Sequence, residues 1–128
     1  MKIMQRCDML KLEGMINEIT LWIADNINQR ITIADVAARA GYSKWHLQRI
    51  FTKEKKTTIA TWIRDKKLSS AAHDLIYTAD TIIDISLRYG YDSQQSFTRS
   101  FSKKFNVSPC RFRTINSVHK LTEIYEDY

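Results

Sequence analysis

Glycine, proline and cysteine are all scarce in this chain of 128 residues, which contains 3 Gly, 1 Pro and 2 Cys. With so few residues that break helices or form turns, an all-α fold is favoured over a sheet protein. No apolar run approaches the roughly 18 residues that a membrane span needs. The first residues also lack an apolar signal region followed by a small-residue cleavage site. We therefore expect no membrane partner and a cytoplasmic location.

The two cysteines, Cys7 and Cys110, make no metal-ligand spacing with each other or with His46, His73 and His119. We expect no metal and no cofactor. Reduced, unpaired thiols are the simplest interpretation, and a redox-sensing pair is the alternative. The chain also shows no Ser/His/Asp or Cys/His arrangement, no carboxylate pair and no phosphate-binding loop, so an enzyme is not expected.

Positive charge is concentrated in two parts of the chain, whose net charge is +6. Residues 39–67 hold nine Lys and Arg against Glu54 and Asp65, a balance of +7. Residues 88–113 hold six against Asp92, a balance of +5, and the remaining segments are weakly acidic. Such clustering indicates a polyanion partner, although small basic domains can show it by chance.

One sequence pattern occurs twice. Residues 32–42 read TIADVAARAGY, and residues 81–91 read TIIDISLRYGY, 49 positions later. Each copy begins like a capping box, with Thr32 before Asp35 and Thr81 before Asp84. A glycine follows where the helix must end, and Ser43 or Ser93 can cap a second helix. Two helix-turn-helix units in tandem on a basic chain point to DNA.

The repeat divides the chain into five segments. Residues 13–57 form the first helix-turn-helix subdomain, opened by an amphipathic helix over residues 13–28. Residues 58–77 read as one continuous connecting helix, and residues 78–115 form the second subdomain, closed by a short helix from Ser108-Pro109. A flexible tail is expected over residues 1–12 and a further tail over residues 116–128. The connecting helix should span roughly 30 Å, a scale that matches two successive major grooves about 34 Å apart.

The second helix of each unit has one apolar face and one polar face. Asp92 is an insertion in the second turn, so the copies are offset by 50 residues beyond it. The apolar stripes, which we assign to the core, are Leu47, Ile50 and Phe51, then Phe97, Ser100 and Phe101. The opposite faces carry side chains suited to base edges in a major groove. The candidate base-reading residues are Trp45, Gln48 and Arg49 in the first unit, and Gln94, Gln95, Thr98 and Arg99 in the second.

Alternatives exist for the most informative of these residues. Trp45 could fold back onto a neighbouring helix as part of the core. Arg49 and Arg99 could contact phosphates or only solvent. Candidate contacts to the DNA backbone are hydroxyl and basic side chains, namely Ser43, Lys44, Arg64, Ser93, Ser102 and Lys103.

Residues 41–49 (GYSKWHLQR) and 93–99 (SQQSFTR) resemble the AraC/XylS family of bacterial transcription regulators, and within it the short MarA/SoxS/Rob branch. The family's closing pattern is matched by Pro109, Phe112 and Arg113. The resemblance covers about residues 13–115. It implies two helix-turn-helix subdomains on a long helix, binding as a monomer to an asymmetric site across two major grooves. It also implies activation through contact with RNA polymerase, and the branch's base-reading positions fall on the seven residues named above.

The sequence departs from the family pattern in two places. Members often have Gly shortly after the first recognition helix, where this chain has the run 53–57 (KEKKT), so that helix could end differently. Phe97 replaces a smaller aliphatic residue, which should only repack the core. Family members with effector domains place them outside this region, so no small-molecule effector is expected.

We therefore predict a DNA-binding transcription activator that is able to repress from some sites. By resemblance, its genes would concern multidrug or oxidative-stress resistance. The main alternative is a basic protein-interaction module with only non-specific affinity for nucleic acid, because helix-turn-helix folds are reused for binding proteins. RNA binding is disfavoured because the aromatic residues lie on core stripes rather than on an exposed stacking platform.

Overall fold

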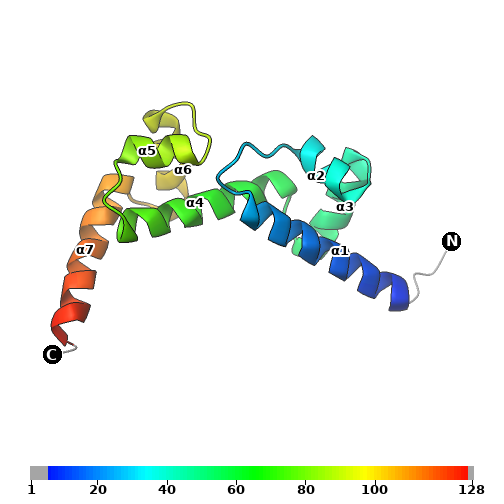
Figure 1. Ribbon diagram of the computed structural model, residues 1–128, viewed down its shortest axis with the longest axis horizontal. Helices are drawn as coiled ribbons and strands as arrows, with labels where there is room; N and C mark the ends of the chain where they lie inside the picture. Colours follow the sequence, from blue (N-terminus) through cyan, green and yellow to red (C-terminus); the bar gives the residue numbers. More distant parts are fainter. Residues whose placement is uncertain (1–5, 127–128) are drawn as a thin grey trace. The chain divides into compact units, whose positions relative to one another are not determined.

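The computed structural model of the chain is helical. It describes the backbone of residues 6–126 and the side chains of residues 12–117. In this part of the chain there are seven helices and no strand (Figure 1). The all-α prediction is thus confirmed. The helices are α1 (Arg6–Asp25), α2 (Ile33–Ala40), α3 (Lys44–Lys55), α4 (Ile59–Tyr77), α5 (Ile82–Arg88), α6 (Gln94–Phe105) and α7 (Pro109–Glu126).

The chain divides into two compact units, Met1–Lys66 and Lys67–Tyr128, and the division falls inside α4. In the first unit α1 packs against α2 and α3. Its core is aliphatic apart from Phe51. Within α1, α3 and α4 the core residues recur at intervals of three or four positions, the spacing of one helix face. The buried residues are Ile16, Ile19, Ile23, Val36, Ala37, Leu47, Phe51, Ile59 and Ile63.

The second unit has an aromatic core. Phe97 and Phe101 of α6 are 0% exposed. The Phe101 ring lies 4.5 Å from Phe105 and 5.2 Å from Phe112 of α7, centroid to centroid. Leu68, Ala71 and Leu75 of α4 and Ile85 of α5 are also buried in this unit. Phe97 is therefore a core residue, as the sequence predicts.

Arg113 joins α7 to the end of α4. Its Nε donates to the carbonyl oxygen of Leu75 at 2.9 Å, and its Nη2 donates to that of Thr78 at 3.4 Å. The last carbonyls of a helix have no partner within the helix, so a guanidinium that binds them stabilises its end. This contact gives a structural reason for the Arg113 in the closing pattern of the sequence.

The predicted caps are present. Thr32 and Asp35 form a reciprocal capping box, with Asp35 N donating to Thr32 Oγ1 at 3.1 Å and Thr32 N donating to Asp35 Oδ2 at 3.0 Å. Thr81 Oγ1 accepts from Asp84 N at 3.1 Å. Gly41 and Gly90 have φ of +76° and +81°, the left-handed conformation that glycine adopts without a steric penalty.

The ends of α3 and α6 show how the chain turns without glycine. Lys56 and Asn106, 50 residues apart, both have φ of 59° and cap these helices. Thr58 and Ser108 then accept from backbone amides three residues on, at the starts of α4 and α7. The first recognition helix therefore ends where its counterpart does, although Lys replaces the usual Gly. The structural repeat therefore extends beyond the similar stretches 32–42 and 81–91, as far as Thr58 and Ser108.

Two helices are longer than the sequence predicts. α1 begins at Arg6, inside the segment 1–12 that is expected as a tail, and residues 1–5 lie outside the described part. α7 runs to Glu126, through most of the predicted tail 116–128. Neither extension contains a proline, so nothing stops the helix.

Candidate nucleic-acid interface

Helix α3 presents one face to the core and the other to solvent. Ser43 caps the helix, its Oγ accepting from His46 N at 3.2 Å. Leu47 and Phe51 are 0% exposed and set the rotation of the helix. On the opposite face Gln48 and Arg49 are exposed. The three predicted base-reading residues of this unit therefore share one outward surface, because Trp45 lies on the same face as Gln48 and Arg49.

Trp45 is not a core residue, since 66% of its surface is exposed. The guanidinium carbon of Arg49, one turn further on, lies over its ring at 4.8 Å from the centroid. Such a cation–π contact at an exposed site is worth about 0.5–1 kcal/mol. It holds the Arg49 guanidinium beside the indole while leaving its hydrogen-bond donors available.

Helix α6 repeats this arrangement with different chemistry. Ser93 caps it, with Ser96 N donating to Ser93 Oγ at 3.1 Å. Phe97 and Phe101 face the core, so the other side of the helix is turned outward. A shallow hollow of about 580 Å³ lies on that side, lined by Gln94, Gln95, Thr98, Arg99 and Ser102. All four predicted reading residues of the second unit thus meet in one hollow, together with one predicted backbone contact.

The remaining predicted backbone contacts are more dispersed. Lys44 and Lys103 are exposed on α3 and α6, close to the reading residues of their own helices. Ser43 and Ser93 have their hydroxyls engaged as helix caps, so a structural role accounts for them as well. Arg64 stands on α4, apart from α3, and its Nη2 donates to Thr61 Oγ1 at 3.5 Å.

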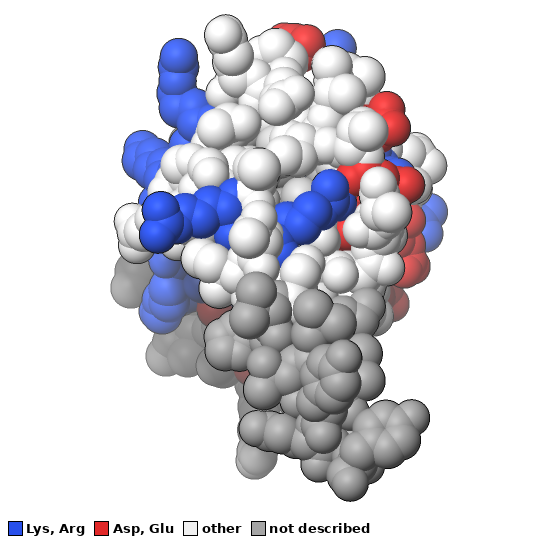
Figure 2. All heavy atoms as spheres, turned by 90° about the vertical axis from the view of Figure 1, so that its left-hand side faces the viewer, with Lys and Arg blue, Asp and Glu red and all other residues white. Residues whose placement is uncertain are grey.

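Sequence reasoning missed several basic side chains. Lys53 lines a groove that also contains Trp45 and Arg49. The Lys55 and Lys66 ammonium groups lie over the Trp62 ring, at 5.4 and 4.9 Å from its centroid. The local charge of +7 over residues 39–67 is the only sign of them in the sequence. Figure 2 looks onto the second unit, from whose surface basic side chains project.

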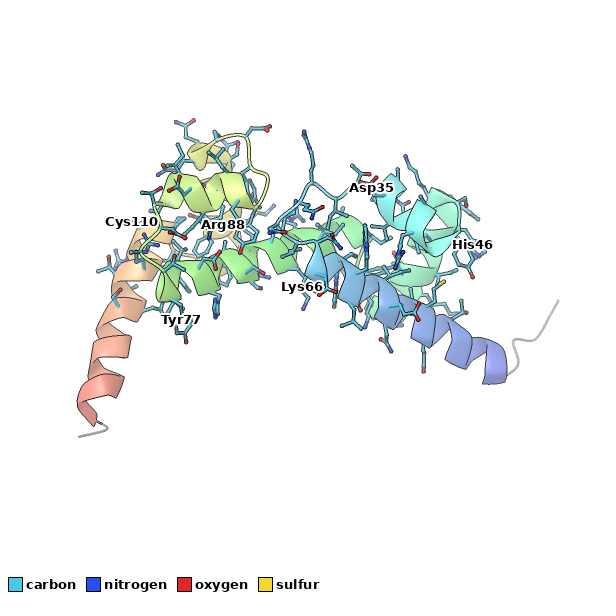
Figure 3. The ribbon with its side chains drawn as sticks, viewed as in Figure 1. Asp35, His46, Lys66, Tyr77, Arg88 and Cys110 are labelled. Atoms are coloured by element: carbon cyan, nitrogen blue, oxygen red, sulfur yellow. The ribbon has the colours of Figure 1, made fainter. Side chains whose placement is uncertain are left out.

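A separate charged network lies between α4 and α5 and is structural. Arg88, which is labelled in Figure 3, donates to Asp74 Oδ2 at 2.9 Å and to Asp80 Oδ2 at 2.7 Å. The Tyr89 hydroxyl donates to the same Asp74 oxygen at 2.6 Å. The hydrogen bond from Arg88 lowers the pKa of the Asp80 carboxyl. Burial, followed by the hydrogen bond to Asp74, raises the pKa of Tyr89, so its hydroxyl keeps its proton and remains a donor.

Among the side chains that the structure describes, no group of three or more His, Cys, Asp or Glu residues is placed to hold a metal ion. Cys110 is an exposed free thiol, and Cys7 lies outside the described side chains. Within residues 6–126, no helix combines the length and the apolar composition that crossing a membrane requires.

Known proteins similar to this chain include several that are named as transcription regulators. The TetD protein of transposon Tn10 from Escherichia coli is 46% identical over 99 residues, covering 77% of this chain and 72% of that protein. The multiple antibiotic resistance protein MarA of Salmonella typhimurium is 40% identical, covering 79% and 80%. The right origin-binding protein of Escherichia coli is 44% identical, covering 78% of this chain but 35% of that protein. The chain thus spans about a third of that longer relative.

Solved structures show the same fold. The xylose-binding transcription activator XylR superposes with a TM-score of 0.75 at 30% identity, covering 81% of this chain and 27% of that one. The DNA-binding domain of AdpA, solved with a target DNA, gives 0.77 at 18% identity over 81% and 94%. The family pattern described as a helix-turn-helix domain matches residues 36–115. With its two capped helix pairs and these relatives, the chain belongs to the AraC/XylS family of DNA-binding transcription regulators, in the branch of MarA and Rob, and not to a family of enzymes.

Proposed function

We propose that the chain activates transcription by binding as a monomer to an asymmetric DNA site, with α3 and α6 entering two successive major grooves. One observation carries the proposal: each helix turns its candidate base-reading side chains away from two fully buried residues, Leu47 and Phe51 in α3 and Phe97 and Phe101 in α6. Solvation alone would be served equally well by Lys and Glu. An exposed tryptophan and a group of glutamines are better explained by base contacts.

The chemistry of the two faces differs, which supports an asymmetric site. Arg49 and Arg99 can each donate two hydrogen bonds to guanine N7 and O6. Gln94 and Gln95 can donate to and accept from adenine, whereas Trp45, at the position equivalent to Gln95, offers an apolar surface to thymine methyl groups. Because the two recognition helices differ, they would bind two different half-sites. One copy of the protein would be enough to occupy both.

Activation, the partner enzyme and the target genes are proposed from the relatives. MarA is named for multiple antibiotic resistance, and AarP of Providencia stuartii, 40% identical over 100 residues, is named a transcriptional activator. We infer that this chain acts likewise in the cytoplasm, by contact with RNA polymerase at promoters of resistance genes. Repression would follow where the site overlaps the promoter.

The first test is selection of bound sequences from a randomised DNA pool, followed by footprinting of the winner at near-physiological salt. A split, asymmetric motif protected over about two helical turns by one protein molecule is expected. A footprint confined to one major-groove segment would refute simultaneous reading. No enriched motif, with binding lost as salt rises, would favour the protein-interaction module instead.

A matched pair of substitutions on α6 separates base contacts from phosphate contacts. Arg99→Ala should cost about 1–3 kcal/mol on the selected site and relax the preference at one base pair. Lys103→Ala, one turn further along, should weaken binding to all sequences alike and reduce the salt dependence. Equal loss of affinity on every sequence for Arg99→Ala would contradict base readout at that position.

A further inference from the structure

A groove of about 670 Å³ beside the first reading face is not explained by DNA recognition. Its apolar side chains are Leu12 of α1, Tyr42 of the turn, and Trp45 and Ile50 of α3. We call it the first-unit groove. Its volume lies within the range of about 300–1,000 Å³ that is typical of small-molecule sites, and those sites are mostly apolar with a few polar groups.

The second unit shows that base reading does not need such a groove. The hollow on α6, at the equivalent reading face, is lined only by Gln, Thr, Arg and Ser side chains. The first unit instead leaves Trp45 66% exposed at the edge of an apolar wall.

The charges around the groove select the kind of ligand. Arg49 and Lys53 lie one turn apart on α3 and both line the groove, while Glu54 is the one acidic side chain in its lining. His46 also lines it, and its ring makes an edge contact with that of Tyr42, 5.0 Å between centroids. A guanidinium binds a carboxylate through two parallel hydrogen bonds. Because Arg49 lies over the Trp45 ring at 4.8 Å, a carboxylate bound to it would lie next to the indole.

We propose that the first-unit groove binds a small, flat aromatic carboxylate. Its ring lies against Trp45 and Tyr42, and its carboxylate pairs with Arg49 and Lys53. Because Trp45 and Arg49 also belong to the reading face, the ligand and DNA compete for the first unit. The helix-turn-helix unit would then sense a small molecule directly, without a separate effector domain.

Calorimetric titration of the full chain with 2-naphthoate tests the ligand class. The neutral 2-naphthalenemethanol and the cationic 2-naphthylmethylammonium carry the same ring system and serve as controls. For a ligand of this size we expect one site with a Kd of about 1 mM or below, and weaker binding of both controls. Amide NMR shifts should be confined to Leu12 and residues 42–54. Equal binding of all three compounds, or equal shifts in residues 94–105, would overturn the proposal.

The internal repeat supplies matched variants. Lys53→Gln should weaken naphthoate binding about threefold to tenfold, whereas Lys103→Gln, the same change 50 residues later, should leave it unaltered. Trp45→Ala should weaken binding more than Gln95→Ala does. Because Trp45 is exposed, its truncation leaves the core intact, which circular dichroism can check. Equal effects within either pair would contradict a site in the first unit.

Competition is measured with fluorescently labelled DNA carrying the selected site, with sodium acetate as the ionic-strength control. Naphthoate should raise the apparent Kd for DNA by a factor of one plus the ratio of its concentration to its own Kd, and acetate should not. Unchanged DNA affinity at saturating naphthoate would overturn the competition. The titration with naphthoate alone requires no DNA, so its outcome is independent of the proposed function.

Discussion

Removal of Arg88 should destabilise the second unit alone. Its guanidinium joins α5 to Asp74 of α4 and to Asp80 of the intervening turn, at 2.9 and 2.7 Å. Arg88→Ala breaks both ion pairs but leaves Asp74 with the hydrogen bond from the Tyr89 hydroxyl. The variant therefore weakens the network without leaving its more buried carboxylate wholly unpaired.

The magnitude follows from burial. The Asp74 side chain is 18% exposed and that of Arg88 is 35% exposed, so their pair is partly shielded from water. A hydrogen bond to a charged group in such a place contributes about 1.5–3 kcal/mol. The Asp80 side chain is 43% exposed, so its pair is screened and adds little. We expect the free energy of unfolding of the second unit to fall by about 2–3 kcal/mol.

The distribution of tryptophan makes the assay specific to one unit. Trp22, Trp45 and Trp62 are the three tryptophans of the chain, and all lie in the first unit. Urea unfolding followed by tryptophan fluorescence therefore reports the first unit, whereas far-UV circular dichroism reports both. In Arg88→Ala part of the dichroism should be lost about 2 M urea earlier, given a slope near 1 kcal/mol/M, with no change in the fluorescence transition.

The control is Arg111→Ala, which removes an exposed arginine from the same unit and should move neither transition. If Arg88→Ala shifted fluorescence and dichroism together, the two units would unfold as one cooperative body. If it shifted neither, the ion pairs would contribute nothing measurable. Either result would refute the reasoning.

Three further predictions concern other residues. Because Arg88 lowers the pKa of Asp80 below its ordinary 3.8, the contribution of their pair is present above about pH 4 and is lost as the pH falls through the lowered pKa; Asp80→Asn should therefore slightly reduce the fall of the dichroism-detected urea midpoint below about pH 4, and an unchanged dependence there would contradict this. Lys56 adopts a left-handed conformation that Asn tolerates better, so Lys56→Asn should raise the fluorescence-detected midpoint, by about 0.5 kcal/mol in free energy; a lower midpoint would argue against strain. The contact between Trp45 and Arg49 should make their alanine substitutions non-additive in DNA affinity by about 0.5–1 kcal/mol, and strict additivity in a double-mutant cycle would mean that the stacking does not assist binding.

Local signals in the sequence were sufficient for the helix pairs and their outward faces. A threonine before an aspartate, a glycine at a helix end and an apolar residue every three or four positions each act within one or two turns of chain. The repeat supplied a second, independent reading of each signal. The faces of α3 and α6 could be predicted because Leu47, Phe51, Phe97 and Phe101 set the rotation of their helices.

Features that depend on distant residues could not be predicted in this way. Asp74 and Arg88 are 14 positions apart, and their ion pair exists only once α4 and α5 have packed. The first-unit groove requires Leu12 to reach α3, although Leu12 lies in the segment expected as a tail. The left-handed Lys56 is atypical of its residue type, so only its position relative to Asn106 could have indicated it.

The division of the chain inside α4 has a consequence for its synthesis. The first unit is complete at Lys66, and the 62 residues of the second unit are still to be made. At about 5–20 residues per second their synthesis takes roughly 3–12 s, whereas small helical units fold in microseconds to milliseconds. The aliphatic core of the first unit can therefore fold on the ribosome while the second unit is still being translated. Four of the five phenylalanines belong to the second unit, so they are exposed only after the first unit has had time to fold.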